Sequence, residues 1–311
     1  MASSAIALAY RPPAFAAAAS RYVYVAGSDA WCDVRTGSLF SRSSLDGLLA
    51  HQFERSPSRQ LLTWARTPKV ERLRYLPGVS DLIFARDGEW CLNRWKPSML
   101  RPSTGQWSNI NHLIESLMPD PDQRTHLLNV LAYVVQEPAG KVKHALVLTG
   151  VPGCGKTSLA KIAGRLVGDH NYREADGHLL TGRWLNLFVD CQVLAIEEVM
   201  HGDRFEVSDK LKTLITAPEL KVEAKNVDFF DGRTPNLIFI LSNDRRPLAL
   251  TEGARREWMP DFVEARLDDN FFSRLHASLE AELPCFLDAL MNRDIARFNP
   301  DAPPPMTSAK A

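Results

Sequence analysis

The strongest chemical signal in the sequence is a glycine-rich segment followed by a lysine and a hydroxyl residue. Gly150, Gly155, Lys156 and Thr157 have the spacing G-x-x-x-x-G-K-T. This pattern is typical of a loop whose backbone amides face phosphate oxygens, with a lysine that reaches the β- and γ-phosphates and a hydroxyl that ligates Mg²⁺. We expect ATP phosphates to bind along the whole segment, which comprises Gly150, Val151, Pro152, Gly153, Cys154, Gly155, Lys156, Thr157 and Ser158.

Acidic and amide residues follow two apolar runs further along the chain. Glu197 and Glu198 end the run VLAI, and Asn243 follows LIFILS. Carboxylates that follow a buried strand can lie beside a phosphate-binding loop. We therefore expect Glu197 to hold Mg²⁺ together with Thr157, and Glu198 to accept a proton from the attacking water. Asn243 is expected to hydrogen-bond the γ-phosphate and that water.

A pair of arginines comes after these elements. Arg255 and Arg256 stand in the segment GARREW. They are interpreted either as surface charge or as an arginine finger that neutralises transition-state charge at the ATP of a neighbouring subunit. Arg255 is favoured over Arg256 for that role.

The elements that must position these residues indicate an α/β fold. The runs ALVLT, VLAI and LIFIL lack alternation, which favours strands buried on both faces, and helical stretches separate them. A parallel sheet with flanking helices is therefore expected, preceded by a small helical or α+β region. The expected parts are a flexible leader (1–20), an accessory domain (21–106), a helical segment (107–140), the ATPase core (141–266), two C-terminal helices separated near Pro284 (267–297) and a disordered tail (298–311).

Composition excludes several classes of protein. The chain has 311 residues and equal numbers of basic and acidic side chains, 37 each, with 45% hydrophobic residues. These values are typical of a globular protein and argue against one that binds nucleic acid by bulk positive charge. The balance is uneven, because the first 110 residues hold 14 Lys and Arg against 8 Asp and Glu. A basic run from 55 to 74 is interpreted as solvated surface or as a nucleic-acid contact.

The five cysteines and the apolar runs bear on localisation. The cysteines are scattered without a C-x-x-C pair, which favours a reducing compartment. No apolar stretch reaches the roughly 18 to 20 residues of a membrane span. We therefore expect a cytoplasmic protein without membrane contact.

In this order the elements resemble the superfamily 3 viral helicases, and most closely the helicase domain of phage primase-helicases and primase-polymerases. The resemblance covers residues 107–300 well and 20–106 loosely. It implies an AAA+-like P-loop NTPase fold, ATP and Mg²⁺ as ligands, a ring of identical subunits that is expected to be a hexamer, and movement along single-stranded or forked DNA in phage or viral replication. The chain shows no primase domain, so a primase or polymerase partner is expected to be a separate protein or another part of a longer gene product.

The same resemblance assigns a DNA contact to Lys225. The family places a lysine at this position on a hairpin that enters the central channel of the ring. Phe229 and Phe230 are interpreted either as base or sugar contacts or as residues that pack the hairpin on its domain.

Two alternative functions remain open from the sequence. An ATP-dependent replication assembly or loading factor without unwinding activity would use the same nucleotide motifs. A P-loop kinase is the third hypothesis, although the second acid at Glu198 and the strand that ends at Asn243 favour water as the acceptor.

Overall fold

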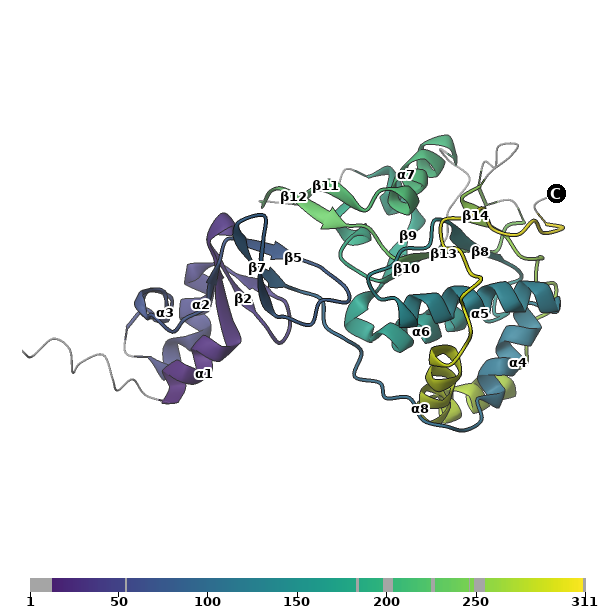
Figure 1. The fold of residues 1–311 in the computed structure, drawn as a ribbon, viewed down its shortest axis with the longest axis horizontal. Coiled ribbons are helices and arrows are strands. Elements are labelled where there is room, and N and C mark those ends of the chain that lie inside the picture. The colour runs from purple at the N-terminus through teal and green to yellow at the C-terminus, as the bar shows by residue number, and fades with distance from the viewer. Residues whose placement is uncertain are drawn as a thin grey trace, which may run out of the picture. The chain divides into compact units, whose positions relative to one another are not determined.

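The computed structural model describes residues 13–53, 55–182, 185–197, 204–224, 227–245, 247–248 and 255–309. The chain forms two compact units (Figure 1). Unit 1 comprises Met1–Tyr75 and Ser80–Arg94, and unit 2 comprises Leu76–Val79 and Trp95–Ala311. The glycine-rich loop, Glu197 and Asn243 all belong to unit 2.

Unit 1 consists of short helices and strands around an aromatic core. Its helices are α1 (Pro13–Arg21), α2 (Arg42–Leu49) and α3 (Pro57–Thr63), with 3-10 turns at Ala26–Ser28 and Ala50–Gln52. One sheet has the order β3-β2-β1-β4 and contains β1 (Tyr22–Val25), β2 (Ala30–Asp33), β3 (Leu39–Phe40) and β4 (Lys69–Val70). A second sheet has the order β5-β7-β6 and contains β5 (Arg72–Arg74), β6 (Ile83–Arg86) and β7 (Glu89–Asn93). Trp31, Leu45 and Leu61 are fully buried between the first sheet and the helices.

Two features of unit 1 bear on the expected flexible leader and on the basic run from 55 to 74. Helix α1 occupies part of the segment expected to be a flexible leader, and Phe15 is buried because it packs edge-on against Phe53 and Trp64. Within the basic run, Arg72 forms an ion pair with Glu89 at 2.5 Å.

Unit 2 contains a five-stranded sheet in which every strand pair is parallel. Its order is β14-β8-β13-β10-β9. The strands are β8 (Ala145–Thr149), β9 (Tyr172–Asp176), β10 (Val193–Glu197), β13 (Leu237–Ser242) and β14 (Glu257–Trp258). Every residue of β8 and β13 is buried, which confirms the expectation that these unalternating runs are covered on both faces.

Helices cover both faces of this sheet (Figure 1). On one face lie α4 (Ser108–Leu117), α5 (Pro121–Gln136), α6 (Lys156–Val167) and α8 (Asp269–Met291). On the other face lie α7 (Arg204–Thr216) and 3-10 turns at Gly177–Thr181 and Leu185–Phe188. A further 3-10 turn, Asp169–Asn171, precedes β9, and a separate antiparallel hairpin joins β11 (Glu219–Ala224) to β12 (Val227–Arg233). The expected α/β class with a parallel sheet is confirmed. None of the helices in the described ranges is both long and apolar enough to cross a bilayer.

The C-terminal part differs from the sequence analysis. Two helices were expected there, but α8 continues through Pro284. A proline inside a helix removes one backbone hydrogen bond. The buried side chains of Leu283, Phe286 and Leu290 on either side of Pro284 pack into the core, and this packing outweighs the lost bond.

The segment after α8 was expected to be disordered from residue 298 onward. Phe298 instead packs against the core, and the Lys143 amide donates to the Pro300 carbonyl at 2.9 Å. The Thr307 hydroxyl, which is buried, donates to the Met259 carbonyl. Residues 298–309 therefore lie against the rest of unit 2, held by tertiary contacts that the local sequence does not predict.

A buried carboxylate joins α4 to α8. Glu282 is 7% exposed and accepts hydrogen bonds from the Ile110 amide at 3.0 Å and the Asn109 side-chain amide at 2.7 Å. Ile110 lies in the first turn of α4, where backbone amides lack intrahelical partners. Glu282 thus caps one helix from another.

We expect the Glu282→Ala change to lower the free energy of unfolding by about 2 kcal/mol, because it leaves the buried Ile110 amide in the first turn of α4 unpaired and removes one of the two hydrogen bonds of the Asn109 side-chain amide. Urea unfolding measures this change. Glu280→Ala is the matched control, since Glu280 is exposed and its ion pair with Arg165 lies at the surface, and it should cost less than about 1 kcal/mol. Equal losses in the two variants would contradict the capping role.

Candidate functional site

The loop between β8 and α6 needs glycine at two positions. Gly153 and Gly155 have φ angles of 76° and 107°, in the region that favours glycine. A Cβ on Gly155 would lie 2.5 Å from Leu113 Cδ1 of α4, so only glycine fits there. The loop therefore lies close to α4 and ends where α6 begins. The first turn of α6 has amides without intrahelical partners, which makes it suited to an anion.

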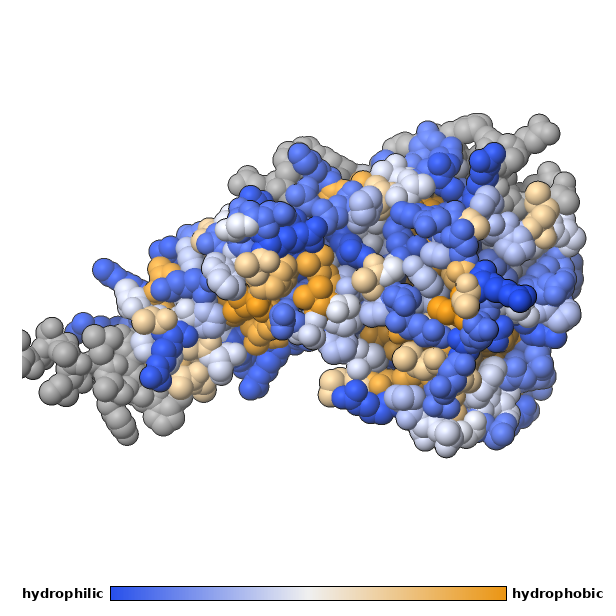
Figure 2. All heavy atoms as spheres, in the orientation of Figure 1, coloured by the Kyte–Doolittle hydropathy of each residue, from blue (hydrophilic) through white to orange (hydrophobic). Residues whose placement is uncertain are grey.

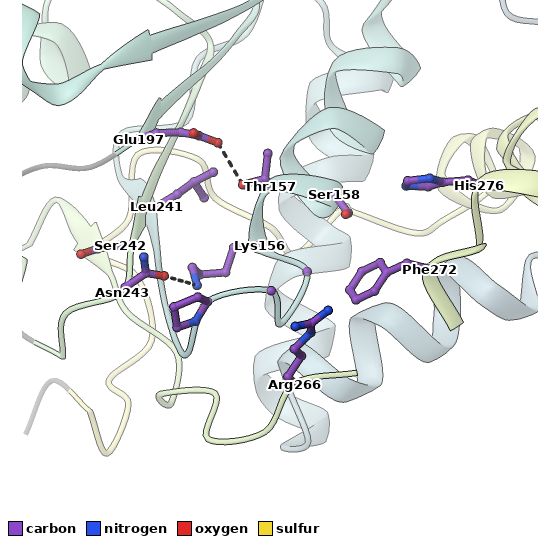
Figure 3. A pocket seen from close by; sticks show the side chains of 13 residues that line it. Lys156, Thr157, Ser158, Glu197, Leu241, Ser242, Asn243, Arg266, Phe272 and His276 are labelled. Atoms are coloured by element: carbon purple, nitrogen blue, oxygen red, sulfur yellow. Dashed lines mark hydrogen bonds between the residues drawn. The ribbon is translucent and has the colours of Figure 1, made fainter. Parts of the chain in front are cut away.

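Lys156 folds back over this loop. Its Nζ donates to the carbonyls of Gly150 at 2.8 Å and Val151 at 3.1 Å, and to Asn243 Oδ1 at 3.1 Å (Figure 3). These three partners are neutral oxygens, so the hydrogen bonds hold the ammonium in place without cancelling its charge. The site thereby keeps a buried positive charge next to the first turn of α6.

Thr157, the residue after Lys156, contacts Glu197 of β10. The Thr157 hydroxyl donates to Glu197 Oε1 at 2.9 Å (Figure 3). Glu197 ends β10, where it is paired in register with Leu241 of β13. The parallel sheet thus brings Glu197 and Asn243 to the edge at which β8 leads into the loop. A hydroxyl and a carboxylate oxygen are the ligand types that Mg²⁺ takes when it keeps several waters.

The neighbourhood of Glu197 is negatively charged. Tyr172 Oη donates to Glu174 Oε1 at 2.9 Å. Burial, this hydrogen bond and the charges of Glu174 and Glu197 raise the pKa of the Tyr172 phenol, in that order of importance. The phenol therefore stays neutral. Glu174 also pairs with Lys161 at 3.6 Å outside the cavity lining, whereas Glu197 lines the cavity, where its carboxylate favours a bound cation.

The loop, β10 and β13 enclose a cavity of about 390 Å³. Of the residues expected to form the site, eight line it, and they are Pro152, Gly153, Gly155, Lys156, Thr157, Ser158, Glu197 and Asn243. Leu241 and Ser242 of β13 line it as well. Three members of the expected loop are placed elsewhere: Gly150 and Val151 accept from Lys156 through their carbonyls, and Cys154 is buried beneath the loop.

Sequence reasoning missed one wall of this cavity. Arg266, Phe272 and His276 line it from the start of α8 and the segment before it. The spacing of Phe272 and His276 places them one helical turn apart on the same face, which is the signal that could have found them. That spacing is also normal for a helix packed on a core, so nothing separated these residues from core positions.

Arg255 and Arg256 lie away from the cavity of their own chain. Both are exposed, and they precede β14, which pairs with Ala145 at the start of β8. The loop follows the other end of β8, and the strand alone spans roughly 15 Å. Neither arginine lines the cavity, and the finger role assigned to this pair stays a prediction.

Two expected site residues, Glu198 and Lys225, lie outside the described residues. Glu198 directly follows β10, and Lys225 lies in the connection between β11 and β12. Phe229 and Phe230 belong to β12. Their assigned roles stay predictions.

Comparisons with known proteins agree with the fold. Residues 148–256 match a family described as a family of unknown function, DUF5906. A search of curated proteins found none that matches. Among solved structures, the apo structure of the NrS-1 C-terminal region (305–718) has a TM-score of 0.74 at 15% identity, covering 92% of this chain and 70% of that one. The A form apo structure of the same region has a TM-score of 0.73 at 15% identity, with the same coverage of both chains. At this identity the similarity concerns the fold.

Proposed function

We propose that this protein is an ATP-hydrolysing motor that moves along single-stranded DNA, as a ring helicase of the superfamily 3 type. One observation carries the proposal. The side chains of Lys156 and Thr157 at the start of α6 converge on one cavity with those of Glu197 and Asn243, which end or follow the neighbouring parallel strands β10 and β13. Lysine, hydroxyl, carboxylate and amide are the groups that hydrolysis of a phosphoanhydride requires.

The strand order supports water as the acceptor of the phosphoryl group. Strand β13 lies between β8, which leads into the loop, and β10, which carries Glu197. Asn243 therefore follows the middle strand of the three and contacts the Lys156 ammonium, from where its side chain can hydrogen-bond the γ-phosphate and an attacking water. Asn243 positions that water, and Glu198, the residue after Glu197, accepts its proton.

Each loop residue has a defined task in this reaction. Lys156 turns from the carbonyls of Gly150 and Val151 to the β- and γ-phosphates, and the first-turn amides of α6 bind the same oxygens. Thr157 and Glu197 supply the oxygens for Mg²⁺. Mg²⁺, when bound, neutralises charge that develops on the phosphate oxygens.

The hairpin gives the proposal its DNA contact. Strands β11 and β12 follow β10 and α7 in the chain and precede β13. In the sequence, the hairpin therefore lies between Glu197 and Asn243. Its base is held firmly, because Lys141 Nζ donates to the Leu214 carbonyl at the end of α7, at 2.8 Å, and to Thr234 Oγ1 just after β12, at 2.9 Å. Because the hairpin follows β10 and α7 in the chain and leads into β13, we expect movements of these strands during hydrolysis to reach Lys225.

A direct test is an ATPase assay together with displacement of one strand from forked DNA of both polarities, with ATP and Mg²⁺. Strand displacement would support the helicase. DNA-stimulated hydrolysis without displacement would instead support a loading or assembly factor in replication, for which a separate primase or polymerase would be the partner. Phosphate transfer to a small acceptor would support a kinase.

We expect Lys156→Ala to lower kcat for ATP hydrolysis about 100-fold or more, because it removes the buried charge that faces the phosphates. Steady-state ATPase kinetics measure this change. Lys161→Ala is the matched control, since Lys161 lies on the same helix and pairs with Glu174 outside the cavity wall. Turnover that survives in Lys156→Ala would refute the assignment of the whole site.

A mixing experiment tests whether Arg255 acts on a neighbouring subunit. Arg255→Ala should lower hydrolysis about 1000-fold, the effect of losing an arginine finger. In an equal mixture of Arg255→Ala and Lys156→Ala, about a quarter of the interfaces of a ring combine an intact cavity with an intact arginine. We therefore expect ATPase activity to reappear in the mixture, whereas an arginine acting in its own subunit would give none. The same experiment with Arg256→Ala decides between the two residues.

For the hairpin, Lys225→Ala should leave basal ATPase activity within about twofold but abolish strand displacement, because the change removes a phosphate contact and leaves the cavity intact. Lys221→Ala serves as the control, since Lys221 is an exposed lysine of β11 on the same hairpin. Strand displacement at the normal rate in Lys225→Ala would show that the hairpin does not contact DNA in this way.

A further inference from the structure

The cavity has two chemically different ends (Figure 3). At one end lie Glu197 and Asn243, which follow or end strands of the sheet. At the other end lie Phe272 and His276 of α8. Lys156 and Thr157 lie between them. The lysine and hydroxyl hold the phosphates in the proposed function, and the acid and amide act at the γ-phosphate. The rest of a nucleotide must then extend toward α8.

The segment before α8 and the first turns of α8 pack against the glycine-rich loop. The Arg266 guanidinium lies against Gly153, since a Cβ there would be 3.1 Å from Arg266 Nε. The Phe272 ring lies over Gly155, with Cε1 and Cζ 3.6 Å from the position of a Cβ. His276 comes one turn later and lines the cavity together with Ser158 (Figure 3).

The two aromatic residues are held by different means. Phe272 packs partly against the core, and its ring meets that of Phe271 edge-on at 5.5 Å between centroids. Its remaining surface faces the cavity. His276 is exposed at the mouth of the cavity. A fixed aromatic face with a ring nitrogen donor or acceptor beside it is suited to a heteroaromatic base, which offers a π-face and polar edges.

We propose that α8 forms the base-binding wall of this site, with Phe272 stacking on the nucleobase and His276 contacting its edge. This inference rests on the proposed function, because the position of the phosphates orients the nucleotide. The inference narrows the ligand class: the site takes a nucleoside polyphosphate, and inorganic polyphosphate lacks the contacts to Phe272 and His276.

The test compares two ligands by isothermal titration calorimetry, MgADP and Mg-tripolyphosphate, because only the first has a base. Phe272→Leu keeps an apolar side chain against the core but loses the ring. We expect it to weaken MgADP binding about tenfold and to leave Mg-tripolyphosphate binding within twofold. His276→Ala should weaken MgADP binding about fivefold with the same selectivity. Arg274→Ala, an exposed α8 residue outside the cavity lining, is the control and should change neither affinity.

The outcomes separate this inference from the proposed function. Equal weakening of both ligands by Phe272→Leu and His276→Ala would show that the α8 residues only shape the loop and would overturn the inference alone. Unchanged MgADP binding in both variants would do the same. A wild-type protein that binds neither ligand would overturn the proposed function as well. If Phe272→Leu does not fold, the exposed position of His276 lets His276→Ala carry the test by itself.

Discussion

The hydrogen bond from Thr157 to Glu197 exists because three strands run parallel in register. Glu197 is the register partner of Leu241, and Leu241 is the partner of Leu148 in β8. Strands paired in this way end at the same edge of the sheet. The loop after β8, the acid that ends β10 and the amide after β13 therefore meet at this edge, and the strand pairing alone is enough to bring them together. A slip of one residue in this register would move Glu197 to the opposite face of the sheet, away from Thr157. The buried apolar side chains on both faces prevent such a slip, and the chemistry of the site therefore depends on the hydrophobic core.

The second constraint is the close packing around the glycine-rich loop. Leu113 of α4 and Phe272 of α8 both approach Gly155, and Val263 approaches Gly150. These residues come from segments before and after the sheet, so the loop is enclosed by helices that are distant in sequence. Glu282 joins α4 to α8 through the Ile110 amide. The helices that enclose the loop are thus also bonded to each other, and their positions relative to the cavity are set together.

Much of unit 2 could be predicted from the sequence, and the reason is physical. A strand buried on both faces has no alternation, so the runs that became β8, β10 and β13 were recognisable, and the polar residues that follow them had a predictable edge. Phe272 and His276 were not recognisable, because a helical face that lines a cavity has the same period as one that packs on a core. The continuation of α8 through Pro284 and the ordered segment at 298–309 depend on tertiary contacts such as those of Phe286 and Phe298. Local propensity carries no record of such contacts.

The zero net charge of the chain does not describe the charges inside the site. Lys156 donates to neutral carbonyl and amide oxygens, while Glu197 places a carboxylate on the other side of the cavity. Positive and negative groups therefore lie on opposite sides of one cavity. The net charge of the chain does not reveal this local separation of charge. The same reasoning applies to DNA. If the proposed ring encloses a DNA strand, its topology retains the strand, and positive charge is needed only at the hairpin to which the DNA contact is assigned. A chain with no net charge satisfies both requirements, whereas an open surface that held DNA by charge alone would not.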